Sequence, residues 1–113
     1  MAKPIRRVAL VGPTEERFAV HTAGYPLDPD RMLPVADVIL VVSQPKGDTM
    51  LFRYTAYGEI CGDTPHDSLA DAEEQARREY GDALLEWMDV PPDVKDAHQF
   101  AIQYAHERLE SRE

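Results

Sequence analysis

The sequence predicts an α+β fold in which a four- to five-stranded, mainly antiparallel sheet carries two helices packed on one face. Two observations support this prediction. Short apolar runs separated by glycine and proline turns fill the first half, and two segments with apolar residues at helical spacing lie in the second half. A length of 113 residues suits a single domain, residues 1–113, that can bury a core without disulfides.

The first half of the chain predicts four strands, at residues 5–11, 17–22, 35–43 and 49–55. We expect the first two to pair as a hairpin, and the proline-rich residues 23–34 to form a loop within the domain. Residues 38–42 are all apolar, which indicates a strand in the middle of the sheet, buried on both faces. Residues 44–48 then form a hairpin loop to the fourth strand.

A turn at residues 56–59 leads to a short return strand at Ile60 and Cys61. Pro65 has no N–H to donate and disfavours helical geometry in the residue before it, so residues 62–67 are predicted to break the strand. Cys61 is the only cysteine, which excludes an intrachain disulfide and favours a small buried side chain.

Ser68 is predicted to cap a helix that ends at Gly81. Its apolar face contains Leu69, Ala72, Ala76 and Tyr80. Its opposite side carries two expected i,i+4 ion pairs, Glu73 with Arg77 and Glu74 with Arg78.

Residues 84–90 are predicted to form a strand, because the two prolines that follow end it. This strand is expected either at an edge of the sheet or beside its central strand. Asp96 begins a second capping pattern, which predicts a final helix. The apolar face of that helix contains Ala97, Phe100, Ala101, Tyr104 and Ala105.

A spaced pattern runs through the second half of the chain. It reads Tyr54-x-x-x-Gly58-x-x-x-Gly62-Asp63-Thr64-x-His66, then Ala72, Gln75-Ala76, Glu79-Tyr80-Gly81, Trp87, Val90-Pro91, Asp93-Val94 and Phe100-Ala101. A chain with this pattern resembles a group of small bacterial proteins of unknown function. The resemblance implies one compact unit, and it brings no activity, ligand or catalytic residue.

The net charge of −9 is unevenly distributed. Residues 1–58 carry a net charge of +1 and residues 59–113 a net charge of −10, so the helical half is the acidic half. Carboxylates that face outward from the helices would repel free nucleic acid. They would either keep the protein in solution or dock a basic partner, as small immunity-type and inhibitor proteins do.

No motif in the sequence specifies a chemistry, because nucleophile-elbow and glycine-rich phosphate-loop patterns are missing. Asp63, His66 and Asp67 are residue types that bind divalent ions, but the positive end of the following helix disfavours a cation there. Turn hydrogen bonds are the preferred explanation of these residues, so we assign no catalytic residue, metal ligand or cofactor. Trp87 is either part of the core or an anchor presented to a partner.

The leading hypothesis is a non-enzymatic, cytoplasmic protein-interaction or regulatory module whose acidic helical face or Trp87 region contacts a basic protein. The first alternative is a small-ligand-binding protein or hydrolase that uses the loop of Asp63 and His66. The second is a structural homo-oligomer joined at a sheet edge. The longest apolar run is too short to cross a bilayer and no signal-peptide pattern is present, so we expect no membrane contact.

Overall fold

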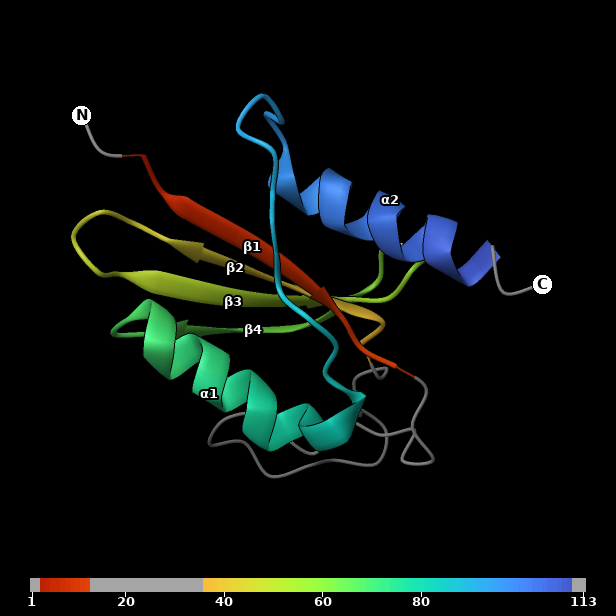
Figure 1. Cartoon of the computed structure of the whole chain (residues 1–113), viewed down its shortest axis with the longest axis horizontal. Helices are drawn as coiled ribbons and strands as arrows, with labels where there is room; N and C mark the ends of the chain where they lie inside the picture. Colours follow the sequence, from red (N-terminus) through yellow and green to blue (C-terminus); the bar gives the residue numbers. More distant parts are fainter. Residues whose placement is uncertain (1–2, 13–35, 111–113) are drawn as a thin grey trace.

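A five-stranded antiparallel sheet organises the computed structural model, which describes residues 3–12 and 36–110. The strands are β1 (Ile5–Leu10), β2 (Val38–Ser43), β3 (Thr49–Tyr54), β4 (Ile60–His66) and β5 (Met88–Asp89). Their order across the sheet is β4-β3-β2-β1-β5 (Figure 1). The predicted α+β class with a mainly antiparallel sheet is confirmed. The strand predicted at residues 17–22 and the loop at 23–34 lie outside the described residues.

The apolar strand β2 lies in the middle of the sheet, as its sequence predicts. It pairs with β1 on one side and β3 on the other, and Val38 to Val41 are fully buried. The predicted hairpin loop joins β2 to β3, and in it the N–H of Gln44 donates to the carbonyl of Asp48 over 2.8 Å. Gly47 supplies the positive φ of 103° that this turn requires.

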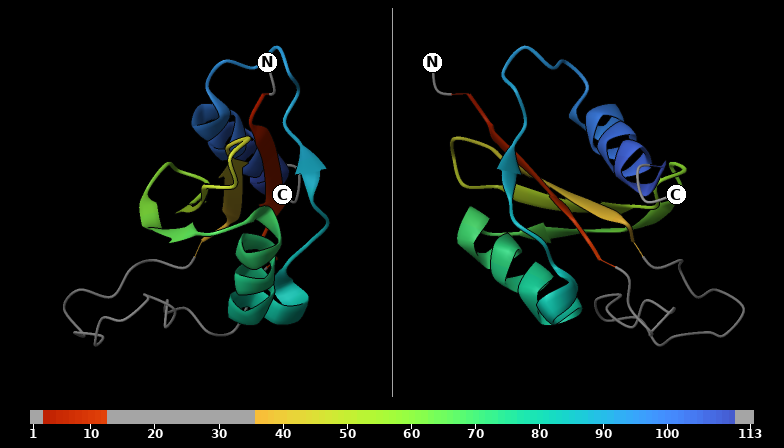
Figure 2. Two further views of the ribbon diagram at one scale, coloured as in Figure 1. Left: turned by 90° about the vertical axis from the view of Figure 1, so that its left-hand side faces the viewer. Right: turned by 45° about the vertical axis from the view of Figure 1, so that its right-hand side comes forward.

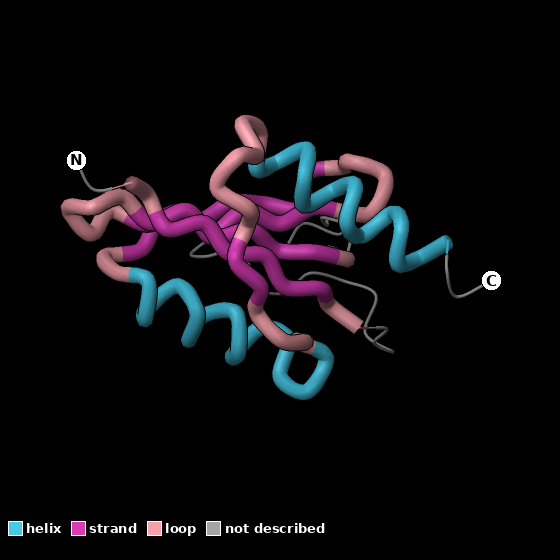
Figure 3. The backbone as a smooth tube through the Cα atoms, turned by 45° about the horizontal axis from the view of Figure 1, so that its top comes forward, coloured by secondary structure: helices cyan, strands magenta, loops and turns pink. Residues whose placement is uncertain are grey.

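The two helices, α1 (Leu69–Tyr80) and α2 (Ala97–Glu110), lie on opposite faces of the sheet (Figures 1 and 3). Because successive strand residues point to opposite faces, each face has its own core. The core under α2 contains Val8, Leu10, Val38, Leu40, Ala97, Ala101 and Ala105. The core under α1 contains Ala9, Ile39, Val41, Leu51, Cys61, Ala72 and Ala76. The expected packing of both helices on one face is wrong, because a strand that is apolar on both sides needs a cover on each.

The helix boundaries follow the predicted caps. The Ser68 hydroxyl accepts from the N–H of Asp71 over 3.1 Å, and the Asp96 carboxylate accepts from the N–H of Gln99 over 3.1 Å. Gly81 ends α1 with a φ of 53°. Both predicted apolar faces pack against the sheet, which confirms the amphipathic reading of these segments.

The predicted ion pairs of α1 are confirmed in part. Glu74 pairs with Arg78 over 2.9 Å. Glu73 instead reaches Arg7 of β1 over 3.1 Å, because its side chain lies on the flank of the helix next to the sheet.

The strand β4 is longer than predicted, since it continues through residues 62–66 to His66. Among the described strands, it lies at the edge of the sheet and pairs only with β3. An edge strand tolerates a proline because one side of its backbone has no strand to bond, and Pro65 lies opposite Met50 in the register. The predicted break at Pro65 is therefore wrong.

The segment after α1 follows the opposite edge of the sheet. It begins with a short 3-10 helix, η2 (Gly81–Ala83), and forms an isolated bridge between Leu84 and Val11 before β5 pairs with β1. Figure 2 shows this segment beside β1, on the far side of the sheet from β4. Residues 84–90 thus belong to an edge, although only Met88 and Asp89 form a regular strand. No helix among the described residues is long and apolar enough to span a bilayer.

Candidate functional site

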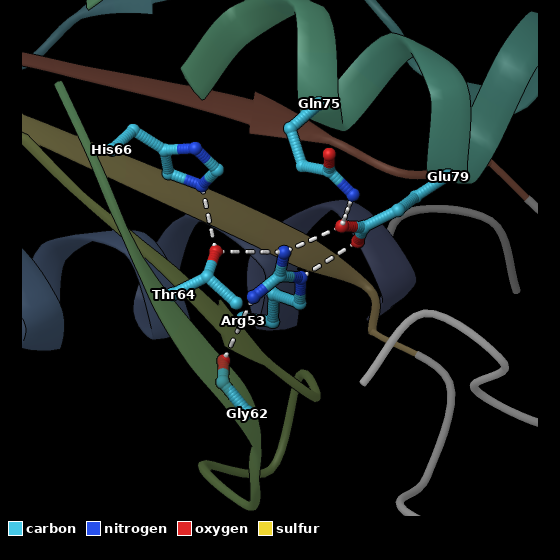
Figure 4. Close-up of polar contacts among 6 residues, drawn as sticks. All are labelled: Arg53, Gly62, Thr64, His66, Gln75 and Glu79. Atoms are coloured by element: carbon cyan, nitrogen blue, oxygen red, sulfur yellow. Dashed lines mark hydrogen bonds and ion pairs between the residues drawn. The ribbon is translucent and has the colours of Figure 1, made fainter. Parts of the chain in front are cut away.

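A buried ion pair joins the sheet to α1. The Arg53 side chain is fully buried on β3 and points toward α1, from which Glu79 meets it with a side chain that is 2% exposed. The Arg53 Nε donates to Glu79 Oε1 over 2.7 Å, and its Nη2 donates to Oε2 over 2.6 Å (Figure 4). Such a two-point contact fixes the guanidinium and the carboxylate in one plane.

Two side chains and one backbone carbonyl complete the hydrogen bonding of this pair. The carbonyl is that of Gly62, which accepts from Arg53 Nη1 over 3.5 Å. Thr64 of β4 accepts from Arg53 Nη2 over 3.1 Å, and Gln75 of α1 donates to Glu79 Oε2 over 2.7 Å. The Thr64 hydroxyl also shares a hydrogen bond of 2.8 Å with His66 Nε2 (Figure 4). Burial and the positive charge of Arg53 lower the pKa of His66. The His66 side chain is half-buried, so this end of the network reaches the surface.

The other face of the sheet is left partly open, because α2 packs mainly on β1 and β2 and reaches β3 through His98 near its start. Along β3, the residues that face α1 are buried, whereas Met50, Phe52 and Tyr54 on the α2 side are only half-buried. On the same side of β4, Ile60, Asp63 and Pro65 are exposed.

An open pocket of about 550 Å³ lies on this uncovered half of the sheet, beside the start of α2. We call it the sheet pocket. Its apolar lining comes from Val42, Met50, Phe52 and Pro65. Its polar lining comes from Gln44, Asp48, Thr49, His66, Asp67 and His98. Within the described part of the chain, the lining thus includes two carboxylates and no lysine or arginine.

His98 of α2 forms the wall of the sheet pocket. Its ring meets Phe52 edge-on with the ring centres 4.5 Å apart, and its Nδ1 shares a hydrogen bond of 2.6 Å with the Tyr54 hydroxyl. Burial and the nearby carboxylates of Asp63 and Asp96 raise the pKa of Tyr54, so its hydroxyl stays protonated. These two contacts hold the His98 ring against β3 in a defined orientation.

The structure does not bring Asp63 and His66 together. They are three residues apart on an extended strand, so their side chains project from opposite faces of β4. His66 joins the Arg53 network, while Asp63 is exposed on the α2 side. Among the described residues, no group of three or more histidine, cysteine or acidic residues is placed to hold a metal ion.

Trp87 and Cys61, to which the sequence also draws attention, lie in or near the core under α1. Trp87 is half-buried against it, while its neighbours Leu85 and Met88 are 40% and 36% exposed. Cys61 is fully buried, and burial together with Asp37 and Glu59 raises the pKa of its thiol to about 12. A thiol in this environment is not a nucleophile at neutral pH.

No protein-family model, curated protein or solved structure matches this chain. The resemblance to small bacterial proteins of unknown function stays a prediction.

Sequence reasoning does not find the Arg53–Glu79 pair, although one signal points to it. Glu79 lies three residues after Ala76, within the stripe of α1 that faces the sheet. A carboxylate in a buried stripe needs an opposite charge from the facing element. The alternation of β3 puts Arg53 on the same side as Leu51, which identifies the partner once the strand is known to face α1.

Proposed function

We propose that the protein is a cytoplasmic protein-interaction or regulatory module that holds a basic segment of a partner protein in the sheet pocket. The observation that carries the proposal is the uncovered α2-side face of β3 and β4, where an apolar floor is bordered by carboxylates.

The apolar floor supplies the area that a partner can bury. Met50 and Phe52 are half-buried and Ile60, further along the same face, is 67% exposed. Covering such side chains removes apolar surface from water, which favours association by about 25 cal/mol per Å² before the cost of ordering is counted. Apolar side chains exposed in this way suit a segment with leucine or phenylalanine side chains.

The surrounding charge selects a basic segment. Asp48 and Asp67 line the sheet pocket, Asp63 is exposed on the same face, and Asp96 caps α2 beside His98. By contrast, the exposed charges of α1 are balanced, because Asp71 and Glu74 are accompanied by Arg77 and Arg78. The proposed contact surface is therefore the sheet pocket, not the outer face of a helix.

The alternatives have less support. A hydrolase that uses Asp63 and His66 needs both side chains in one place, and they project from opposite faces. A homo-oligomer joined at β4 would use the free edge of that strand, where Pro65 has no N–H to donate. It remains an outcome of the test below.

A titration with two synthetic peptides, followed by NMR, tests the proposal. One peptide alternates lysine with leucine and the other alternates glutamate with leucine. We expect the basic peptide alone to shift the amide resonances of Val42, Met50 and Phe52, and to bind more weakly between about 0.05 and about 0.5 M salt as screening increases. Equal binding of both peptides, or shifts confined to other surfaces, would contradict the proposal, as would a self-associated protein whose β4 is already covered.

A matched pair of variants locates the contact. Met50→Lys places a positive charge on the floor of the sheet pocket, and Gln103→Lys places the same charge on the exposed side of α2. We expect Met50→Lys to abolish binding of the basic peptide, whereas Gln103→Lys weakens it slightly. Circular dichroism checks that both variants fold. Equal losses would show that only net charge matters.

A further inference from the structure

Positively charged side chains gather at the start of β1, in contrast to the acidic character of the whole chain. Lys3, Arg6 and Arg7 line an open pocket of about 640 Å³ together with Lys95, which precedes α2. Asp89 is the single carboxylate among the described residues of this lining. We call this the basic pocket. It lies where the loop before α2 passes the N-terminal end of β1 (Figure 1).

The charges in the basic pocket are not all neutralised. Arg7 pairs with Glu73 over 3.1 Å and with Asp89 over 3.2 Å, so its charge is balanced. Lys3, Arg6 and Lys95 form no ion pair with any carboxylate in residues 3–12 and 36–110. Three positive charges therefore share one pocket without a counter-charge from the described part of the chain.

Arg6 is held in place by the backbone that forms the pocket. Its Nη1 donates to the carbonyl of Val94 over 2.7 Å, and its Nη2 donates to the carbonyl of Pro91 over 3.1 Å. The N–H of Val90 donates in turn to the carbonyl of Arg6 over 2.9 Å. These bonds fix the loop before α2 against β1, and they place Lys95 at the same pocket as Lys3.

We propose that the basic pocket binds the phosphoryl group of a small organic phosphate. A phosphate monoester carries about −1.5 to −2 charges near neutral pH and three acceptor oxygens, which Lys3, Lys95 and Arg6 match. Ile5 and Pro92 are exposed apolar side chains of the lining, where an organic group can lie. The volume is within the range of small-ligand sites, about 300–1,000 Å³.

The size of the ligand follows from the charge around the pocket. A long polyanion would also pass over acidic surface and be repelled by it. At physiological ionic strength, charges more than about 8 Å away are largely screened, so a small anion interacts mainly with the positive charges of the basic pocket. This site is separate from the sheet pocket and does not depend on the protein-interaction proposal.

Titrations with inorganic phosphate, phenyl phosphate and benzyl alcohol at constant ionic strength test the inference. We expect phenyl phosphate to shift the amide resonances of Arg6, Val90 and Val94 saturably, inorganic phosphate to do so more weakly, and benzyl alcohol to have no effect. Absence of saturable shifts with either phosphate would overturn the proposal, and so would equal shifts with benzyl alcohol.

Three substitutions that remove one positive charge each locate the site. Lys3→Gln and Lys95→Gln are each expected to weaken phenyl phosphate binding by about tenfold, because each removes a charge-assisted hydrogen bond. Lys46→Gln removes an exposed charge from the β2–β3 loop, outside the basic pocket, and is expected to change binding by less than about twofold. If all three variants weaken binding equally, the effect belongs to the net charge of the protein and the proposed site is wrong.

Discussion

The two faces of the sheet are closed in different ways. On the α1 side, the helix packs on β2, β3 and β4, and the inward side chains of β3 are buried, including the charged Arg53. On the α2 side, the helix packs through alanines on β1 and β2, and the outer two strands remain partly exposed. The extent of cover therefore differs between faces that share the same strands.

The difference shows what each face contributes. We infer that the buried Arg53–Glu79 pair specifies how α1 sits on the sheet, because a shifted helix would leave both charges buried and unpaired. On the α2 side, small alanine side chains let the helix approach β1 and β2 closely, while β3 and β4 stay partly exposed. One face thus contains a buried polar network, and the other retains partly exposed apolar surface.

The strongest test of this comparison is to break the buried pair. Glu79→Ala leaves the Arg53 charge buried without its carboxylate, so we expect a loss of about 3–5 kcal/mol in the free energy of unfolding, measured with urea. Glu74→Ala removes the same group from an exposed pair with Arg78 on the same helix, where the Glu74 side chain is 60% exposed. That control should cost less than about 1 kcal/mol. Equal losses would mean that the buried pair has no special structural role.

A second test compares adjacent residues of β3 that face opposite sides. Leu51 is fully buried under α1, so Leu51→Ala should cost about 2–5 kcal/mol in the free energy of unfolding. Met50 is half-buried on the α2 side, and Met50→Ala should cost about 1 kcal/mol or less because its side chain already contacts water. Urea unfolding of both variants measures the two losses in the free energy of unfolding. A larger loss for Met50→Ala would show that the α2 side is closed.

The features that the sequence predicts are those with local signals. The apolar run of β2 and the caps at Ser68 and Asp96 depend on neighbouring residues, and each is found where expected. The length of β4 could not be predicted, because Pro65 is tolerated only on an edge strand and strand order is not a local property.

The arrangement of the helices was predictable in part. An apolar strand buried on both faces already requires cover on both, which contradicts two helices on one face. The buried Arg53–Glu79 pair could not be predicted, since the two residues are 26 positions apart and meet only through the packing of α1 on β3. The sheet pocket likewise depends on which strands α2 leaves uncovered.

The smallest expected effect concerns pH at the surface end of the Arg53 network. Burial, with the charge of Arg53, lowers the pKa of His66 below its ordinary value of 6.5, so the unfolded chain binds a proton at this residue more readily than the folded chain. Its contribution to stability is complete above pH 6.5, and it declines as the pH falls from there through the folded-state pKa. We therefore expect the wild type to lose more free energy of unfolding between about pH 7.5 and about pH 5.5 than His66→Gln. Urea unfolding of both proteins at each pH measures the difference, and parallel pH profiles would place His66 outside the network in solution.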